Sequence, residues 1–227
     1  MGNKTAEKEE NKVEISRNEI FRYLGYGRME ADERTKDLAE SCLKELERET
    51  SPKSLIKVWP LTLGEEYEID GGCFQTVSRN LWKNLKDCSQ IAVFAATLGA
   101  GADKLIQKYE KLEISRAVVL QAAATAMLEA FCDSACQELK EEYESRGLYL
   151  RPRFSPGYGD FPLENQRNLL DALEAGKRIG IKLTDSLLMT PVKSVTAVMG
   201  ISKKAYRCDV KGCEACEKTD CAYRRES

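Results

Sequence analysis

The residues best suited to bind a small ligand lie between Arg151 and Pro162, where the chain reads Arg-Pro-Arg-Phe-Ser-Pro-Gly-Tyr-Gly-Asp-Phe-Pro. Prolines fix φ and remove N–H donors, while glycines allow backbone conformations that a side chain would forbid. We therefore predict a bent but rigid loop without regular helix or strand. An arginine, a tyrosine and carbonyl groups without a helical or sheet partner suit a ligand that carries a carboxylate, a flat ring and donor hydrogens.

A second group of chemically active residues lies near the end of the chain, where four cysteines follow the spacing C-x4-C-x2-C-x4-C: Cys208, Cys213, Cys216 and Cys221. So short a segment cannot build an apolar core, but four thiolates can fold around one metal. Zinc and a 4Fe–4S cluster both fit four sulfur ligands, and the spacing does not choose between them. Unrelated surface thiols are the alternative to metal ligation.

The remaining cysteines are interpreted as small apolar packing residues. Cys132 and Cys136 are four residues apart on a predicted helix and could face one site, but buried helical cysteines usually pack. Cys42, Cys73 and Cys88 are isolated in the sequence. We expect these thiols to be reduced, because disulfides are rare in the cytoplasm.

Histidine is absent from all 227 residues. Its absence excludes Ser-His-Asp and Cys-His arrangements, most zinc hydrolase sites and a histidine ligand to haem or to corrinoid cobalt from this chain.

The charge pattern argues against nucleic-acid and membrane partners. The 35 basic and 37 acidic residues are interspersed and give a net charge of −2, which provides no field to attract a polynucleotide or an anionic membrane. We see no uncharged apolar run near the ~20 residues of a membrane span and no secretory signal. We therefore expect a cytoplasmic protein.

The elements that must position these residues follow from apolar periodicity and capping signals. We predict a disordered tail over residues 1–12, one domain over 13–203 and a cysteine-rich tail over 204–227. The expected helices are Ser16 to Gly25, one starting at Asp32 with Leu38, Ala39, Cys42, Leu43 and Leu46 on one face, Ser78 to Leu85, Ala102 to Lys111, Ile114 to Ser145, and Leu163 to Ala175 stopped by Gly176. The expected strands are Ser54 to Val58, Glu66 to Asp70, Gln90 to Ala96, Leu187 to Met189 and Ser194 to Met199. Helices and strands without regular βαβ alternation predict an α+β domain with a largely antiparallel sheet.

Three stretches together resemble the reactivation domain of cobalamin-dependent methionine synthase. They are Leu128-Glu129-Ala130-Phe131, Arg153-x-x-x-Gly157-Tyr158, and Gly180-Ile-Lys-Leu-Thr-Asp-Ser with Pro191-x-x-Ser194-Val195. The resemblance covers about residues 90–202, and Arg22-Tyr-Leu-Gly-Tyr26 resembles free-standing versions of the domain. This family binds S-adenosylmethionine and uses it to methylate cobalamin after one-electron reduction of cob(II)alamin. The resemblance implies a C-shaped α+β domain with long helices around an antiparallel sheet.

The resemblance also implies roles for the loop and the long helix. Arg153 would pair with the methionine carboxylate, since a planar guanidinium engages both oxygens at once. Glu129 would hold the ammonium of the ligand or balance its positive charge. The backbone around Ser155 would receive the adenine amino group, and Gly157 and Tyr158 would shape the pocket.

Two further contacts of the family come from other segments. Tyr206 is the candidate for a tyrosine that the family places near the ligand from a later segment. An N-terminal aspartate also belongs to the family site, and Asp32 and Asp70 are the candidates for it.

Each site residue has a structural alternative. Arg153 could be a structural ion-pair partner, Glu129 a solvated helix residue and Tyr158 a packed loop aromatic.

The absence of histidine bears on the partner. Cobalamin-carrying modules often hold the cofactor through an Asp-x-His-x-x-Gly signature, so the cobalt is expected on another protein: cobalamin-dependent methionine synthase or another corrinoid protein, served by a flavodoxin or ferredoxin-type electron donor. Reduced cobalamin is itself the nucleophile, so no conventional catalytic residue is expected; the protein must orient the sulfonium methyl and exclude water.

The cysteine tail would carry electrons or fasten the C-terminus. The alternatives are a non-catalytic metal-stabilised module that docks on a corrinoid protein and an iron–sulfur redox protein.

Overall fold

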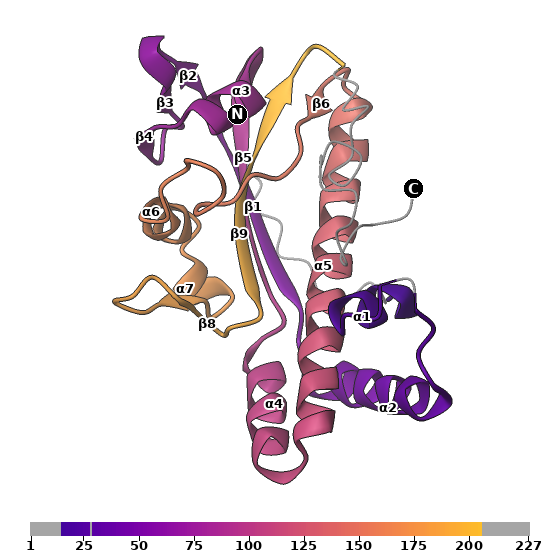
Figure 1. Cartoon of the computed structure of the whole chain (residues 1–227). Helices are drawn as coiled ribbons and strands as arrows, with labels where there is room; N and C mark the ends of the chain where they lie inside the picture. Colours follow the sequence, from indigo (N-terminus) through magenta and orange to yellow (C-terminus); the bar gives the residue numbers. More distant parts are fainter. Residues whose placement is uncertain (1–14, 28, 206–227) are drawn as a thin grey trace.

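The computed structural model describes residues 15–27 and 29–205 (Figure 1). The predicted tail over 1–12, Tyr206 and the four cysteines from Cys208 to Cys221 lie outside these residues. The helices are α1 (Arg17–Tyr23), α2 (Glu33–Glu49), the 3-10 helix η1 (Glu65–Tyr67), α3 (Arg79–Leu85), α4 (Ala100–Leu112), α5 (Ile114–Glu144), α6 (Asn165–Ala172) and α7 (Ala175–Arg178). The strands are β1 (Lys53–Pro60), β2 (Thr62–Leu63), β3 (Glu68–Asp70), β4 (Gln75–Val77), β5 (Cys88–Thr97), β6 (Tyr149–Leu150), β7 (Lys182–Leu183), β8 (Met189–Thr190) and β9 (Ser194–Ser202).

The main sheet has the strand order β1-β5-β9-β6, and each neighbouring pair is antiparallel. Strand β5 lies at its centre, with Thr97 opposite Lys53 of β1 and opposite Ser194 of β9. Two small antiparallel sheets, β2-β3-β4 and β7-β8, accompany it. The prediction of an α+β domain with a largely antiparallel sheet is therefore confirmed.

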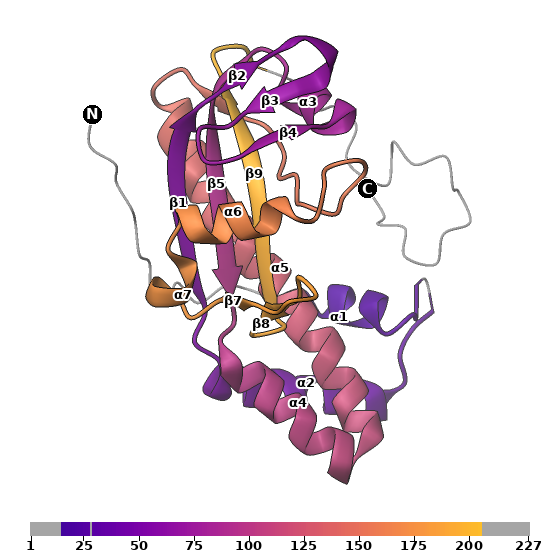
Figure 2. The same ribbon diagram turned by 90° about the vertical axis from the view of Figure 1, so that its left-hand side faces the viewer.

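Both faces of the main sheet are covered, α5 lying against one face and α6, α7 and the small sheets against the other (Figures 1 and 2). Successive side chains of a strand point to opposite faces, and β5 follows this rule. Ala92, Phe94 and Ala96 join the core on the α5 side. Ile91, Val93 and Ala95 join the core on the α6 side. A strand buried on both faces reads as a continuous apolar run, which is why Gln90 to Ala96 could be identified from the sequence.

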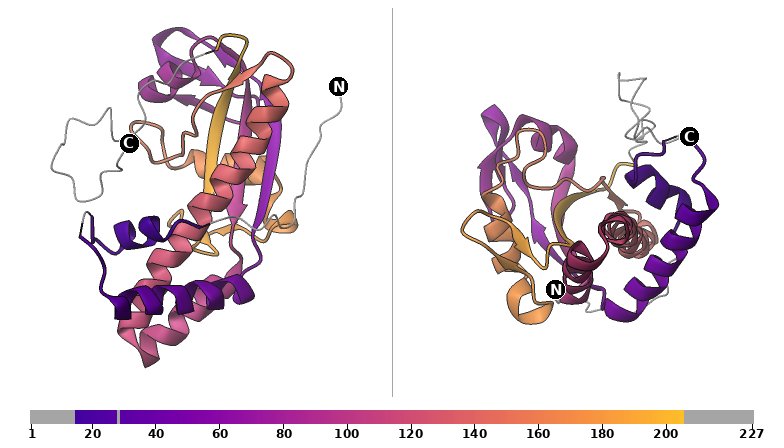
Figure 3. Two further views of the ribbon diagram at one scale, coloured as in Figure 1. Left: turned by 90° about the vertical axis from the view of Figure 1, so that its right-hand side faces the viewer. Right: turned by 60° about the horizontal axis from the view of Figure 1, so that its bottom comes forward.

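Helix α5 is the centre of the helical layer, packing against the sheet and against α1, α2 and α4 (Figure 3). Its buried alanines, Ala122, Ala123, Ala124 and Ala126, allow the neighbouring elements to approach closely. Among the described helices α5 meets the length and hydropathy criteria of a membrane span, and 56% of its most apolar window is buried inside the protein. The core helix of a globular domain meets the same criteria.

Three predicted elements differ from the structure. The strand expected from Glu66 to Asp70 begins only at Glu68, because Glu66 and Tyr67 lie in η1 with φ values of 54° and 67°. The helix expected from Leu163 to Ala175 is two helices, α6 and α7, and the break falls at Glu174, whose φ is 52°, while Gly176 lies inside α7. Tertiary packing decides this break, because Leu173 before the bend and Ala175 after it are both buried. The strand expected from Leu187 begins only at Met189, because Leu187 has a φ of 61° and closes a turn onto Thr184.

Candidate functional site

The chain runs along the edge of the main sheet and so brings the proline-rich loop next to α5. After β6, the chain continues beside β9: the N–H of Arg151 donates to Gly200 O at 2.8 Å, and Phe154 and Val198 exchange two backbone hydrogen bonds of 2.9 Å. Neighbouring side chains of an extended segment point to opposite sides. Phe154 packs into the core on the α6 side, and Arg153 therefore reaches towards α5.

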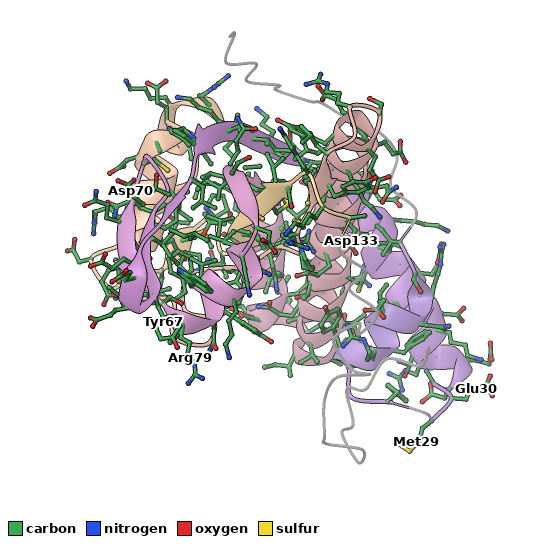
Figure 4. All side chains as sticks on the ribbon, turned by 90° about the horizontal axis from the view of Figure 1, so that it is seen from above. Met29, Glu30, Tyr67, Asp70, Arg79 and Asp133 are labelled. Atoms are coloured by element: carbon green, nitrogen blue, oxygen red, sulfur yellow. The ribbon has the colours of Figure 1, made fainter. Side chains whose placement is uncertain are left out.

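Arg153 is held by two carboxylates of α5. Its Nη2 atom donates to Asp133 Oδ1 at 2.8 Å and to Glu129 Oε2 at 3.1 Å. Glu129 and Asp133 are four residues apart, so they lie on one face of the helix; Figure 4 labels Asp133 on α5. The Arg153 side chain is 22% exposed. This cluster of one guanidinium and two carboxylates is called the Arg153 cluster below.

Two thiols border the Arg153 cluster. Arg153 Nη1 lies 3.9 Å from Cys136 Sγ, and Cys132 is fully buried one turn earlier. Burial raises the pKa of both thiols above the ordinary value, so both stay neutral. Burial works against the charged form of the Arg153 guanidinium, but its pKa still lies above the ordinary value because the carboxylates of Asp133 and Glu129 favour the charged form, so it remains charged.

As predicted, residues 151–162 contain neither a helix nor a strand apart from the bridge at Phe154, and backbone hydrogen bonds cross the loop. Tyr158 N donates to Ser155 O at 3.1 Å, Gly157 N donates to Phe161 O at 2.8 Å, and Phe161 N donates to Tyr158 O at 3.1 Å. Gly157 has a φ of 84°, a conformation that strains most side chains. Phe161 is buried and anchors the end of the loop in the core.

Tyr158 stands at the tip of the loop. Its side chain is 72% exposed, and its ring contacts Phe154 in a T-shaped arrangement with 5.8 Å between centroids. Tyr158 therefore packs against one neighbouring aromatic ring of the loop and is otherwise largely exposed. Its exposed ring is available to a ligand or a partner.

The structure brings Glu129 and Arg153 into direct contact and places Ser155, Gly157 and Tyr158 in the loop that follows. Arg153 forms an ion pair with Glu129 and Asp133, as the structural alternative expected, and Glu129 is a partner of that ion pair and not simply a solvated helix residue.

Neither aspartate considered for the N-terminal contact reaches the Arg153 cluster. Asp32 accepts the N–H of Thr35 at 2.8 Å and caps α2. Asp70 accepts from Gly72 N and Gln75 Nε2 within the β3–β4 hairpin. Figure 4 shows Asp70 on the opposite side of the molecule from α5. Both carboxylates therefore have local structural tasks.

Two residues at the site were missed by sequence reasoning: Asp133 and Asp160. Asp133 could have been found, because it lies one helical turn beyond Glu129. Cys136 packs against the core, as interpreted from the sequence, and its Sγ atom also lies beside Arg153. Asp160 accepts hydrogen bonds from Ser78 and from the start of α3, which lie about 80 residues earlier in the sequence, and no local sequence pattern predicts such a contact.

A separate groove of about 630 Å³ lies between α2 and the start of α5, away from the Arg153 cluster. Most of its charged side chains pair with one another or with neighbours, as Arg116 does with Glu45 at 2.7 Å and Glu40 does with Arg17 at 3.2 Å. A groove whose charges are mostly paired is a weaker candidate for a ligand site than the loop and α5.

The chain is similar to known proteins in sequence and in fold. The family described as "Vitamin B12 dependent methionine synthase, activation domain" matches residues 81–226. A solved structure titled "Crystal Structure of the MetH Reactivation Domain bound to AdoHcy" is similar in fold, with a TM-score of 0.61 and 19% sequence identity. The match covers 89% of this chain and 80% of that one.

Proposed function

Because the chain belongs to the family of vitamin B12 dependent methionine synthase activation domains, we propose that it binds S-adenosylmethionine at the Arg153 cluster. In this proposal it is the reactivation subunit that supports reductive methylation of cob(II)alamin on a separate corrinoid-dependent methyltransferase, with methionine synthase as the expected partner. The crystal structure of a similar fold is described as bound to AdoHcy, which supports this ligand class.

The single observation that carries the proposal is the charge of the Arg153 cluster. One guanidinium and two carboxylates give a net charge of −1, and Arg153 Nη2 lies within 3.1 Å of an oxygen of each carboxylate. S-adenosylmethionine carries one carboxylate, one ammonium and one sulfonium, a net charge of +1. The ligand is therefore the electrostatic counterpart of the site: its carboxylate would bind Arg153, and its cations would lie near Glu129 and Asp133.

The loop supplies groups for the rest of the ligand. The carbonyl of Ser155 accepts one hydrogen bond, from Tyr158 N, and a carbonyl oxygen has a second lone pair. That lone pair would accept the adenine amino group. Gly157 keeps this backbone accessible, and the exposed ring of Tyr158 would close over the ligand.

In the proposed methyl transfer, the main task of the protein is to position the ligand. When the reduced corrinoid attacks, the bond between the sulfonium sulfur and the methyl group breaks with both electrons left on sulfur, and neutral S-adenosylhomocysteine is released. Arg153 and the loop would hold the methyl group towards the partner and exclude water. No proton moves in this step, so the absence of a histidine is no obstacle. The single electron that precedes it would come from a flavodoxin or ferredoxin-type donor.

We also propose that the four C-terminal cysteines bind a metal ion or an iron–sulfur cluster. Among the described residues, no group of three or more His, Cys, Asp or Glu side chains is placed to hold a metal ion. The proposal of a metal site therefore concerns Cys208, Cys213, Cys216 and Cys221 alone, and Tyr206 just before them remains the proposed later contact to the ligand.

Calorimetric titration with S-adenosylmethionine tests the proposal directly. We expect saturable binding that is lost in Arg153→Ala and kept in Arg167→Ala, which removes an exposed arginine of α6. Addition of a cob(II)alamin-loaded methionine synthase and a strong reductant should then yield methylcobalamin, seen by its absorption. Partner binding without any binding of S-adenosylmethionine would instead support a docking module.

A further inference from the structure

The ligand loop is tied to α3 by one carboxylate. Asp160 Oδ1 accepts from Ser78 Oγ at 2.6 Å and from Asn80 N at 3.0 Å, and Asp160 Oδ2 accepts from Arg79 N at 2.9 Å. Three donors thus converge on one side chain. The hydrogen bond from Ser78 is the main cause that lowers the pKa of Asp160, and the carboxylate is ionised at neutral pH.

These donors are the ones that the start of a helix leaves without partners. The first N–H groups of a helix have no acceptor within it. Ser78 Oγ accepts from Leu81 N at 3.1 Å, while Asp160 takes Arg79 N and Asn80 N. The beginning of α3 is therefore capped jointly by its own serine and by an aspartate that lies about 80 residues further along the chain.

The backbone beside Asp160 is fitted to the same helix turn. Gly159 has a φ of 56°, and a Cβ atom placed on it would lie 2.6 Å from Asn80 Nδ2. A side chain at position 159 would therefore require the Asn80 side chain to move. Phe154, which forms a β-bridge with Val198 of β9, and Phe161, which is buried in the core, hold the two ends of the same segment.

We infer that Asp160 is a positioning residue of the ligand site. By holding the loop against α3, it fixes the backbone of Ser155, Gly157 and Tyr158 in the form that receives the ligand, without touching the ligand. The inference rests on the proposed function. A loop that is ordered beforehand loses less conformational freedom on binding, so the affinity depends on this tie.

Calorimetry on Asp160→Asn separates positioning from a general loss of folded protein. An asparagine has one acceptor oxygen for three donors, so at least one hydrogen bond is lost. We expect the Kd for S-adenosylmethionine to rise by about 10-fold, with the number of sites per chain unchanged. A merely structural effect would lower the number of sites and leave the Kd as it is. The matched control is Asp171→Asn on an exposed position of α6, which should bind as the wild type does.

A second measurement follows the loop itself. Hydrogen exchange of the Arg79 and Asn80 amides should become faster in Asp160→Asn. Ser78→Ala, which removes the hydroxyl donor and keeps the carboxylate, should raise the Kd by several-fold, and it provides the test if Asp160→Asn does not fold. A Kd within two-fold of the wild type in both variants would overturn the inference, while loss of binding in Arg153→Ala would leave the proposed function standing. Absence of binding by the wild type would overturn both.

Discussion

Arg153 Nη2 lies 2.8 Å from Asp133 Oδ1, so an ion pair joins the arginine of the loop to the long helix α5. A ligand carboxylate at Arg153 must share or displace a carboxylate that is already there. This arrangement favours ligands that bring positive charge along with their carboxylate, because Asp133 and Glu129 then acquire partners of their own.

Arg153→Lys should weaken ligand binding although it keeps the charge. A lysine ammonium is a point charge and cannot engage two carboxylate oxygens as a planar guanidinium does. Charge-assisted hydrogen bonds contribute about 1.5–3 kcal/mol each, so we expect the Kd for S-adenosylmethionine to rise at least ~10-fold in calorimetry. Arg167→Lys on the exposed side of α6 is the control and should bind normally. Equal affinities of the two variants would remove Arg153 from the carboxylate contact.

Glu129→Gln should change the preference between two ligands that differ by one charge. S-adenosylmethionine carries a sulfonium, whereas S-adenosylhomocysteine carries a neutral thioether. Glu129 is 37% exposed, so solvent screens its field and an effect of about 1 kcal/mol is expected. The Kd for S-adenosylmethionine should rise about 5-fold more than the Kd for S-adenosylhomocysteine. Glu110→Gln on α4 is the control, and equal losses for both ligands would contradict a role for Glu129 in balancing the cation.

The hydrogen bonds between Asp160 and α3 should make the stability of the folded protein depend on pH. Hydrogen bonds lower the pKa of Asp160 in the folded protein, while the unfolded chain has a value near 3.9. The unfolded state therefore binds more protons between the two values, and stability falls with falling pH there. We expect the difference in free energy of unfolding between wild type and Asp160→Asn to be constant above about pH 5 and to shrink below about pH 4. Urea denaturation at a series of pH values measures it; a difference that persists undiminished to about pH 3 would contradict the assignment.

Features of the fold that depend on neighbouring residues could be predicted from the sequence. The caps at Asp32 and Ser78, the apolar run of β5 and the length of α5 are each set within one element. The absence of helix and strand from the proline-rich loop is equally local, because prolines fix φ and glycines allow turn conformations wherever they occur.

Features that join distant segments could not be predicted in the same way. Arg153 meets Glu129 only because the chain runs along β9 first, and that path depends on the strand order of the sheet. Asp160 follows a glycine in a turn, where aspartate is common for local reasons. The neighbouring sequence therefore does not predict its hydrogen bonds to α3. The break at Glu174 likewise depends on what is buried on either side of it.

The cysteine tail should contain metal when the protein is purified without oxygen. Four thiolates at this spacing fit zinc or a 4Fe–4S cluster, so analysis for zinc, iron and acid-labile sulfide should give one ion or one cluster per chain. Replacement of Cys213 and Cys216 by serine should abolish it, while Cys73→Ser, on a half-buried residue of the described domain, should not. Chains without stoichiometric metal would contradict the prediction.

Gly101→Ala should destabilise the protein even though alanine favours helices. Gly101 lies in the first turn of α4, and a Cβ atom there would lie 1.6 Å from the backbone oxygen of Glu49 at the end of α2. Neither backbone can move without separating α4 from α2, and overpacking of this kind costs about 1–3 kcal/mol or more. A loss of ~2 kcal/mol or more, or about 4–8 °C in Tm for a chain of this size, is expected in thermal unfolding.

Gly176→Ala is the matched control for Gly101→Ala, since Gly176 also lies inside a helix. The nearest atom to a Cβ atom at Gly176 is Ile181 O at 3.5 Å, an ordinary contact. Without a clash, replacing a helical glycine by alanine stabilises by about 0.4–1 kcal/mol. The two variants should therefore shift Tm in opposite directions. If both raised it, α4 would not be packed against the end of α2, and the helical layer that supports α5 beneath the Arg153 cluster would need another explanation.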